Sequence, residues 1–65
     1  MTDRQRKDIV EYVRCSTACE CAIFERKSRV IVDLFDNRNA EGYAGQVRMK
    51  YHARVVGRYV GIRPM

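Results

Sequence analysis

The stretch "QVRMKYHARVVGRYVGIRPM", residues 46–65, decides between two folds. From Gln46 to Val55 polar and apolar residues alternate, which is typical of a strand with one basic face. The same stretch also fits a helix over residues 46–62, with an apolar stripe formed by Val47, Tyr51, Val55, Tyr59 and Ile62. The helix organises more residues, although Gly57 and Gly61 each disfavour it by about 1 kcal/mol. We therefore favour the helix, and the strand stays open as the alternative.

In either geometry the stretch presents a row of basic side chains. It contains five lysines and arginines and no acid. Residues 1–15 sum to +1, residues 16–36 to −1 and residues 37–65 to +5, so the basicity is local. A local basic face attracts polyanions such as a nucleic-acid backbone or an acidic protein surface. The residues that we expect to bind are Gln46, Arg48, Lys50, Arg54, Arg58 and Arg63. The plainer interpretation is a solvated face that keeps a small protein soluble.

The first part of the chain is typical of helices, because glycine and proline are absent from residues 1–41. Thr2 with Gln5 matches the capping box of a helix start, and Thr17 with Glu20 matches it again. A first helix is expected from about Asp3 to Cys15, with Ile9, Tyr12 and Val13 buried.

A second helix is expected over residues 18–36, because 100° steps place its charged and apolar side chains on opposite arcs. The β-branched run Val30-Ile31-Val32 argues for a strand. A strand, however, would put Asp33 on one face with Ile31 and Phe35. A turn should follow at residues 36–39, with Asn39 as the N-cap of the next segment.

These segments predict an all-α fold, a small three-helix domain. The alternative is an α+β fold with two helices and a C-terminal β-hairpin. The chain of 65 residues forms one domain, residues 1–65. A chain of this size buries only about 60% of the surface of its unfolded form, so a homodimer or another partner would add stability.

Cys15, Cys19 and Cys21 could bind zinc together with His52. Structural zinc sites combine two close ligand pairs, whereas this C-x₃-C-x-C run meets a single histidine. Cys19 and Cys21 would also point about 200° apart on a helix. We expect small buried cysteines, with no metal and no cofactor. Nothing marks an orienting acid or an oxyanion hole for a cysteine nucleophile, so the protein is not expected to be an enzyme.

The sequence contains no candidate membrane span. Its longest apolar run, Cys21–Phe24, is far shorter than the ~20 residues that cross a bilayer. Asp8 and Glu11 interrupt the basic start that a signal peptide would need. Three cysteines without a pairing framework suit a reducing compartment, so we expect a cytoplasmic protein without membrane contact.

No motif in the chain specifies a chemistry. The favoured function is a nucleic-acid-binding regulator whose last helix presents the basic residues, as in helix-turn-helix proteins. The alternative is an inhibitor or adaptor that occupies a surface on a larger protein. On a basic helix, Arg54→Glu with Arg58→Glu should abolish the interaction and leave the fold intact.

Overall fold

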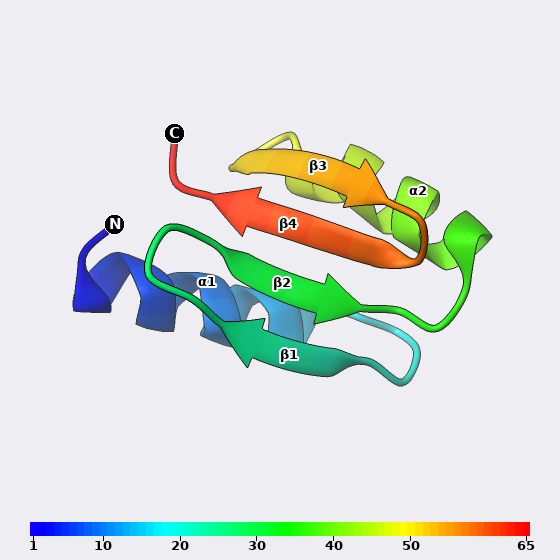
Figure 1. Ribbon diagram of the computed structural model, residues 1–65, viewed down its shortest axis with the longest axis horizontal. Coiled ribbons are helices and arrows are strands. Elements are labelled where there is room, and N and C mark those ends of the chain that lie inside the picture. The colour runs from blue at the N-terminus through cyan, green and yellow to red at the C-terminus, as the bar shows by residue number, and fades with distance from the viewer.

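The computed structural model describes residues 1–65 and contains two helices and four strands. In chain order these are α1 (Asp3–Ser16), β1 (Ala22–Glu25), β2 (Val30–Asp33), α2 (Asn37–Val47), β3 (His52–Val56) and β4 (Tyr59–Arg63). One unit, a helix followed by a β-hairpin, therefore occurs twice. The strands form a single antiparallel sheet in the order β1-β2-β4-β3, so each hairpin supplies one central and one edge strand (Figure 1).

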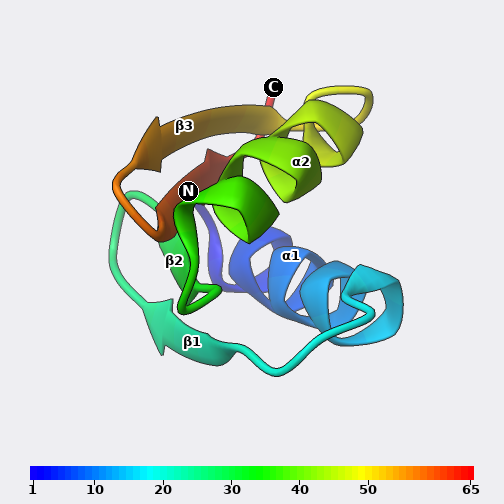
Figure 2. The same cartoon turned by 90° about the vertical axis from the view of Figure 1, so that its right-hand side faces the viewer.

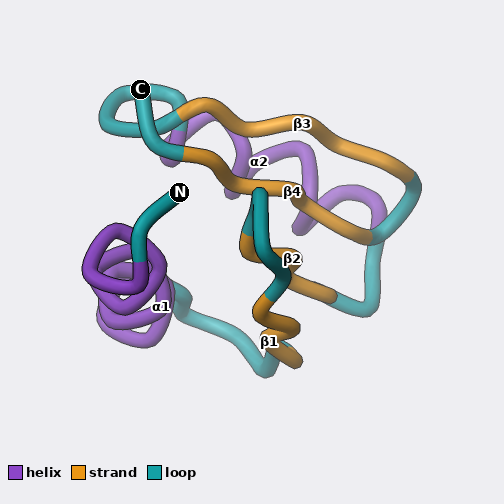
Figure 3. The backbone as a smooth tube through the Cα atoms, turned by 60° about the vertical axis from the view of Figure 1, so that its left-hand side comes forward, coloured by secondary structure: helices purple, strands orange, loops and turns teal.

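Both helices cover the same face of the sheet (Figures 2 and 3). Helix α1 packs against the hairpin β1-β2, and α2 packs against the hairpin β3-β4. The opposite face carries no helix and is turned toward the viewer in Figure 1. The molecule thus has a covered face, which holds the core, and an open face.

The all-α prediction is wrong, because the fold is α+β with a four-stranded antiparallel sheet. The alternative of two helices and a C-terminal hairpin fits, since β3 and β4 form that hairpin. The helix predicted over residues 18–36 is replaced by the hairpin β1-β2, and the second helix is instead α2. The helix predicted over residues 46–62 is also wrong, because α2 ends at Val47.

Residues 30–33 form a strand because the β-branched run favours it and the objection raised by Asp33 is met in three dimensions. Val30 and Val32 are fully buried against the helices, where β-branched side chains pack well. The Asp33 carboxylate is buried, but it accepts a hydrogen bond from the Phe35 N–H at 2.9 Å. It also lies 3.2 Å from Nε of Arg58. These partners offset the desolvation of the carboxylate.

One of the two predicted capping boxes is confirmed. The Gln5 N–H donates to Oγ1 of Thr2 at 3.1 Å, and the Thr2 N–H donates to Oε1 of Gln5 at 2.7 Å. The second box is wrong because Thr17 ends α1. Its hydroxyl donates to the Val13 carbonyl at 2.9 Å, so it serves a helix end.

The N-cap of α2 is Asp36 rather than the predicted Asn39. The Asp36 carboxylate accepts a hydrogen bond from the Arg38 N–H at 2.7 Å. A carboxylate at this position satisfies a free amide and interacts favourably with the helix dipole, which explains where α2 begins.

The hairpin β3-β4 follows the alternation in the sequence. Ala53 and Val55 are half-buried toward the helices, whereas Arg54 between them is exposed. The turn has two residues, and Gly57 at its first position has a φ of 60°. A positive φ at the first residue alone is the pattern of a type II′ hairpin, which glycine adopts without strain.

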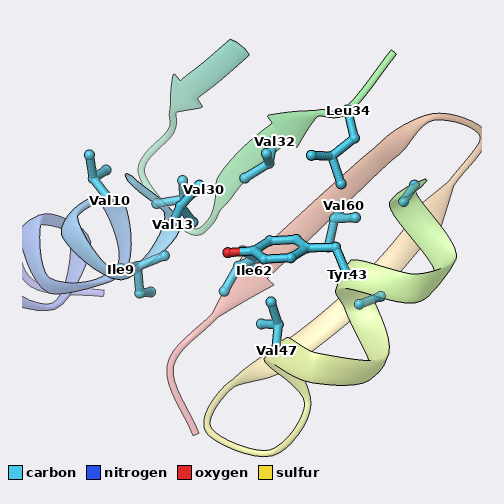
Figure 4. Close-up of a cluster of buried hydrophobic side chains, with 12 residues drawn as sticks. Ile9, Val10, Val13, Val30, Val32, Leu34, Tyr43, Val47, Val60 and Ile62 are labelled. Carbon is cyan, nitrogen blue, oxygen red and sulfur yellow. The ribbon is translucent and has the colours of Figure 1, made fainter. Parts of the chain in front are cut away.

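The core lies between the sheet and the helices (Figure 4). The predicted burial of Ile9 and Val13 is confirmed, whereas Tyr12 is only half-buried and packs edge-on against Tyr51. The buried apolar side chains are Ile9, Val10, Val13, Val30, Val32, Leu34, Ala40, Tyr43, Ala44, Val47, Val60 and Ile62. They are mostly aliphatic and come from α1, α2, β2 and β4, apart from Leu34, which directly follows β2.

Tyr43 joins the two helices through its hydroxyl. The ring lies among the core side chains of α2 and β4, and its oxygen points toward α1 (Figure 4). Because the Ser16 hydroxyl donates its hydrogen to the Tyr12 carbonyl, Tyr43 must donate to the Ser16 oxygen. Burial raises the pKa of Tyr43 above its ordinary value of 10.0.

The raised pKa of Tyr43 predicts a loss of stability at alkaline pH. Above pH 10 the unfolded chain ionises Tyr43 while the folded chain keeps its proton, so the unfolding free energy should fall as the pH rises. Below pH 10 the effect is absent. Urea denaturation of the native chain and of Tyr43→Phe, from pH 8 to 11, checks this. Above pH 10 the unfolding free energy of the native chain should fall more steeply with pH than that of Tyr43→Phe. An equal pH dependence for the two proteins would contradict the prediction.

Candidate functional site

The open face of the sheet is organised in rows that cross all four strands. The register places Phe24 opposite Ile31, Ile31 opposite Gly61, and Gly61 opposite Arg54. Because side chains alternate along a strand, these four residues share one face. They form the middle row of the open face.

A second row lies two residues away, toward the β3-β4 turn. It consists of Ala22, Asp33, Tyr59 and Val56, which are paired in the same way. Tyr59 and Val56 extend the apolar surface of the middle row, and both are exposed.

The third row, at the other end of the strands, is basic. His52 pairs with Arg63, and the Arg26 N–H donates to the Arg29 carbonyl at 3.0 Å. Arg29 and Arg63 each lie one residue beyond the paired residues Val30 and Ile62, so the same register brings them together. This row lies where β4 ends and β3 begins, at the left of Figure 1.

A groove of about 410 Å³ lies on this face. Its floor is Ile31 and Gly61, and its basic residues are Arg26, Arg29 and Arg54. Its remaining apolar residues are Phe24, Val56 and Tyr59, whose exposed fractions are 40%, 61% and 38%. Exposed apolar side chains that gather in one hollow, instead of being scattered singly over the surface, are a common feature of binding surfaces.

None of the three groove arginines has an acidic partner. The ion pairs of the structure join Arg6 to Asp3, Arg6 to Glu25, and Arg58 to Asp33. Glu25 thus pairs with α1 on the covered side, and the one acid of the open-face rows, Asp33, is buried and paired. The groove therefore keeps an uncompensated positive charge, which attracts anions.

Arginines also lie over the aromatic rings of the open face. The Arg26 guanidinium carbon is 5.7 Å from the centre of the Phe24 ring. The guanidinium of Arg58 lies over Tyr59 at 5.4 Å and over Phe35 at 5.9 Å. Cation–π contacts of this kind hold aromatic rings and positive charge side by side.

A second hollow of about 310 Å³ adjoins the groove and shares Arg54 and Gly61 with it. Its other basic residues are Arg48, His52 and Arg63, and it contains no acid. The two hollows form one continuous path from β1 to the free edge of β3.

The predicted binding residues do not form the single row that a helix would give. Arg54 and Arg63 lie on the open face, and Arg48 borders the second hollow, where its Nε donates to the Ala53 carbonyl at 3.1 Å. Gln46 is exposed on α2. Lys50 lies beyond α2, with Nζ 5.4 Å from the ring centre of Tyr12.

Arg58 has a structural role that the sequence did not reveal. It lies in the β3-β4 turn, its carbonyl accepts from the Leu34 N–H at 3.0 Å, and its side chain pairs with the buried Asp33. The contacts with Tyr59 and Asp33 raise the pKa of the Arg58 guanidinium, which stays charged. Much of its charge is thus compensated within the protein.

Seven of the eight groove residues were missed by the sequence analysis: Phe24, Arg26, Arg29, Ile31, Val56, Tyr59 and Gly61. Phe24, Arg26 and Arg29 had been placed on a helix, and Val56 lies just beyond the alternating stretch. Tyr59 was assigned to the core and is instead partly exposed. Only the pairing between distant strands brings these residues together, and no local pattern encodes it.

The cysteines were predicted to be buried, and this is wrong for two of them. Cys15 and Cys19 are exposed at and beyond the end of α1, and Cys21 is half-buried. No group of three or more His, Cys, Asp or Glu side chains is arranged to hold a metal ion. None of the helices has the length and apolar character of a membrane span.

Comparison with known proteins gave no match among protein-family models, curated proteins or solved structures.

The contacts of Asp33 predict which substitutions destabilise the protein. Asp33→Ala should lower the unfolding free energy by about 1–3 kcal/mol, because the Phe35 N–H loses its acceptor. Phe35 has a φ of 62°, so its backbone depends on that hydrogen bond. Urea denaturation measures the effect, with Asp8→Ala on the exposed side of α1 as the control.

Arg58→Glu should also lower the melting temperature, because it brings a second carboxylate next to Asp33. This reverses the expectation for a basic helix, in which both Arg54 and Arg58 were free. Arg54→Glu should leave the melting temperature nearly unchanged. Equal melting temperatures for the two variants would show that the pair with Asp33 contributes little.

Proposed function

We propose that the protein is a non-enzymatic nucleic-acid-binding protein that holds the sugar-phosphate backbone against the open face of its sheet. The observation that carries the proposal is the groove, in which Arg26, Arg29 and Arg54 surround an apolar floor and have no acidic partner. Guanidinium groups bind phosphate oxygens through two parallel hydrogen bonds, and arginine is enriched wherever phosphate is recognised.

The binding surface is a sheet and not the basic helix of the sequence analysis. The cations come from the β1-β2 turn, from β3, from the end of β4 and, for Arg48, from the C-cap of α2, so no helix presents a row of them to a DNA groove. The structure therefore does not suit the helix-turn-helix mode of DNA binding, in which a helix enters the major groove. The proposed class of ligand is unchanged, because it rested on the local positive charge.

A second copy of the chain is a poor occupant for the open face. Two such faces in contact would bring the arginines of one copy against those of the other, and like charges in a desolvated interface repel. A phosphate backbone supplies the opposite charge at regular intervals. An acidic protein would also neutralise the arginines, and the experiment below separates it from nucleic acid.

Charge reversal within the groove should remove binding. Fluorescence anisotropy with labelled single-stranded and duplex oligonucleotides measures the affinity of the native chain and of Arg29→Glu/Arg54→Glu. The matched control is Arg4→Glu/Lys7→Glu, on the exposed side of α1. Each pair lowers the net charge by four, from +5 to +1. The groove variant should lose binding, and the control should retain most of it.

The salt dependence should be that of phosphate neutralisation. For a single strand with about three to four contacted phosphates, the slope of log K against log salt should be roughly −2 to −3 for the native chain. Any residual binding of the groove variant should have a slope that is shallower by about 1.4, which corresponds to two lost phosphate contacts. Polyglutamate serves as the acidic competitor without phosphates or bases. The proposal fails if no oligonucleotide binds, or if both double variants weaken binding equally.

A further inference from the structure

Gly61 lies in the middle of β4, a central strand, where glycine weakens a sheet. Its backbone does not require glycine, because only Gly57 among the glycines has a positive φ. Packing does not require it either. A Cβ at Gly61 would meet Cδ of Arg29 at 3.6 Å and the Arg54 carbonyl at 3.9 Å, which are ordinary van der Waals contacts. What glycine does achieve is an opening at the centre of the groove.

Aromatic rings and arginine side chains surround the opening. Along the middle row Phe24, Ile31 and Arg54 are large, and Gly61 between the last two is not. Tyr59 lies on the same face of β4, two residues before Gly61. Arg29 lies along the opening, with its Cδ close to Gly61. The groove thus combines two aromatic rings with guanidinium groups around a glycine floor.

We infer that this opening receives an unpaired nucleobase, which lies over Gly61 and stacks against Phe24 or Tyr59, so that the ligand is single-stranded nucleic acid. The inference rests on the proposed function and names the form of its ligand. A nucleobase is planar, with faces that stack on aromatic rings and on guanidinium planes. The sugar-phosphate on either side of it would reach the surrounding arginines.

Duplex nucleic acid does not fit the same surface. Within a duplex each base is covered on both faces by its neighbours, so Phe24 and Tyr59 could not stack on it. Reading of a duplex groove needs an element that projects into it, such as a helix or a two-stranded ribbon. The open face is instead hollowed at Gly61 and takes a group that projects from the ligand.

The strand would continue toward the edge of β3. The second hollow begins at Arg54 and Gly61 and leads to Arg48 and Arg63. Both arginines are exposed and neither has an acidic partner. A neighbouring phosphate is therefore the group that this hollow suits.

The test compares oligonucleotides of equal charge with and without bases. The probes are labelled single strands of about ten nucleotides, the same backbone with abasic sites throughout, and the duplex of the same sequence. Anisotropy at one salt concentration gives the three affinities. The abasic strand should bind the native chain at least about fivefold more weakly than the complete strand, the lower end of the effect of one base–aromatic stack.

Two variants locate the base. Phe24→Ala and Gly61→Leu should each weaken binding of the complete strand by about tenfold and leave the abasic strand unaffected. Gly61→Leu fills the opening while favouring a strand, so the fold should survive. Phe35→Ala is the matched control, because Phe35 lies outside the groove and is exposed at least as much as Phe24, 52% against 40%. Circular dichroism checks the fold of each variant.

The outcomes separate the two proposals. If complete and abasic strands bind equally, or if the duplex binds more tightly than the single strand, the base is not held and this inference fails while nucleic-acid binding stands. If no oligonucleotide binds, the proposed function fails and the inference fails with it. If Phe35→Ala weakens binding as much as Phe24→Ala, the base lies elsewhere and the assignment to Gly61 is overturned.

Discussion

The pairing of β2 with β4 is the constraint on which the rest of the structure depends. It is the only strand pairing between the two helix–hairpin units, and it sets Ile31 opposite Gly61. In this register Val30, Val32, Val60 and Ile62 all face the helices. A slip of one residue would turn one set of side chains to the other face, so the buried core fixes the register. The same register aligns the rows of the open face.

The interaction that closes this central pairing lies at its end, where Asp33 accepts from the Phe35 N–H and pairs with Arg58. A buried carboxylate is tolerated only with such partners, and here they come from the next turn of the chain and from the opposite hairpin. The site therefore ties the end of β2 to the β3-β4 turn. Because Arg58 is paired with Asp33, much of its charge is compensated. The positive charge of the groove therefore comes from Arg26, Arg29 and Arg54.

The sequence predicted what is encoded locally. The start of α1 was right because the capping box of Thr2 and Gln5 lies within four residues, and the strand reading of residues 46–55 was correct for His52–Val55. The second helix was wrong because a hairpin with a polar turn, without glycine or proline, matched a helical pattern by chance. Asp33 counted against a strand there, since its partner Arg58 lies 25 positions away in the sequence. The candidate site was found only in part, because Phe24 and Arg54 share a row through three successive strand pairings, and the middle one, β2 with β4, joins segments that are distant in the sequence.

The two faces of the sheet differ in the kinds of residue that they carry, and this difference supports a binding role for the open face. On the covered face the two central strands hold only the β-branched residues Val30, Val32, Val60 and Ile62, which suit a strand and pack against the helices. On the open face a central strand carries Gly61, an edge strand exposes Phe24, and three arginines gather without an acid. Each of these choices disfavours stability or solubility of the free chain, and nothing on the covered face requires them. Because these departures from local rules coincide in one hollow, they support the proposal that the hollow binds a ligand.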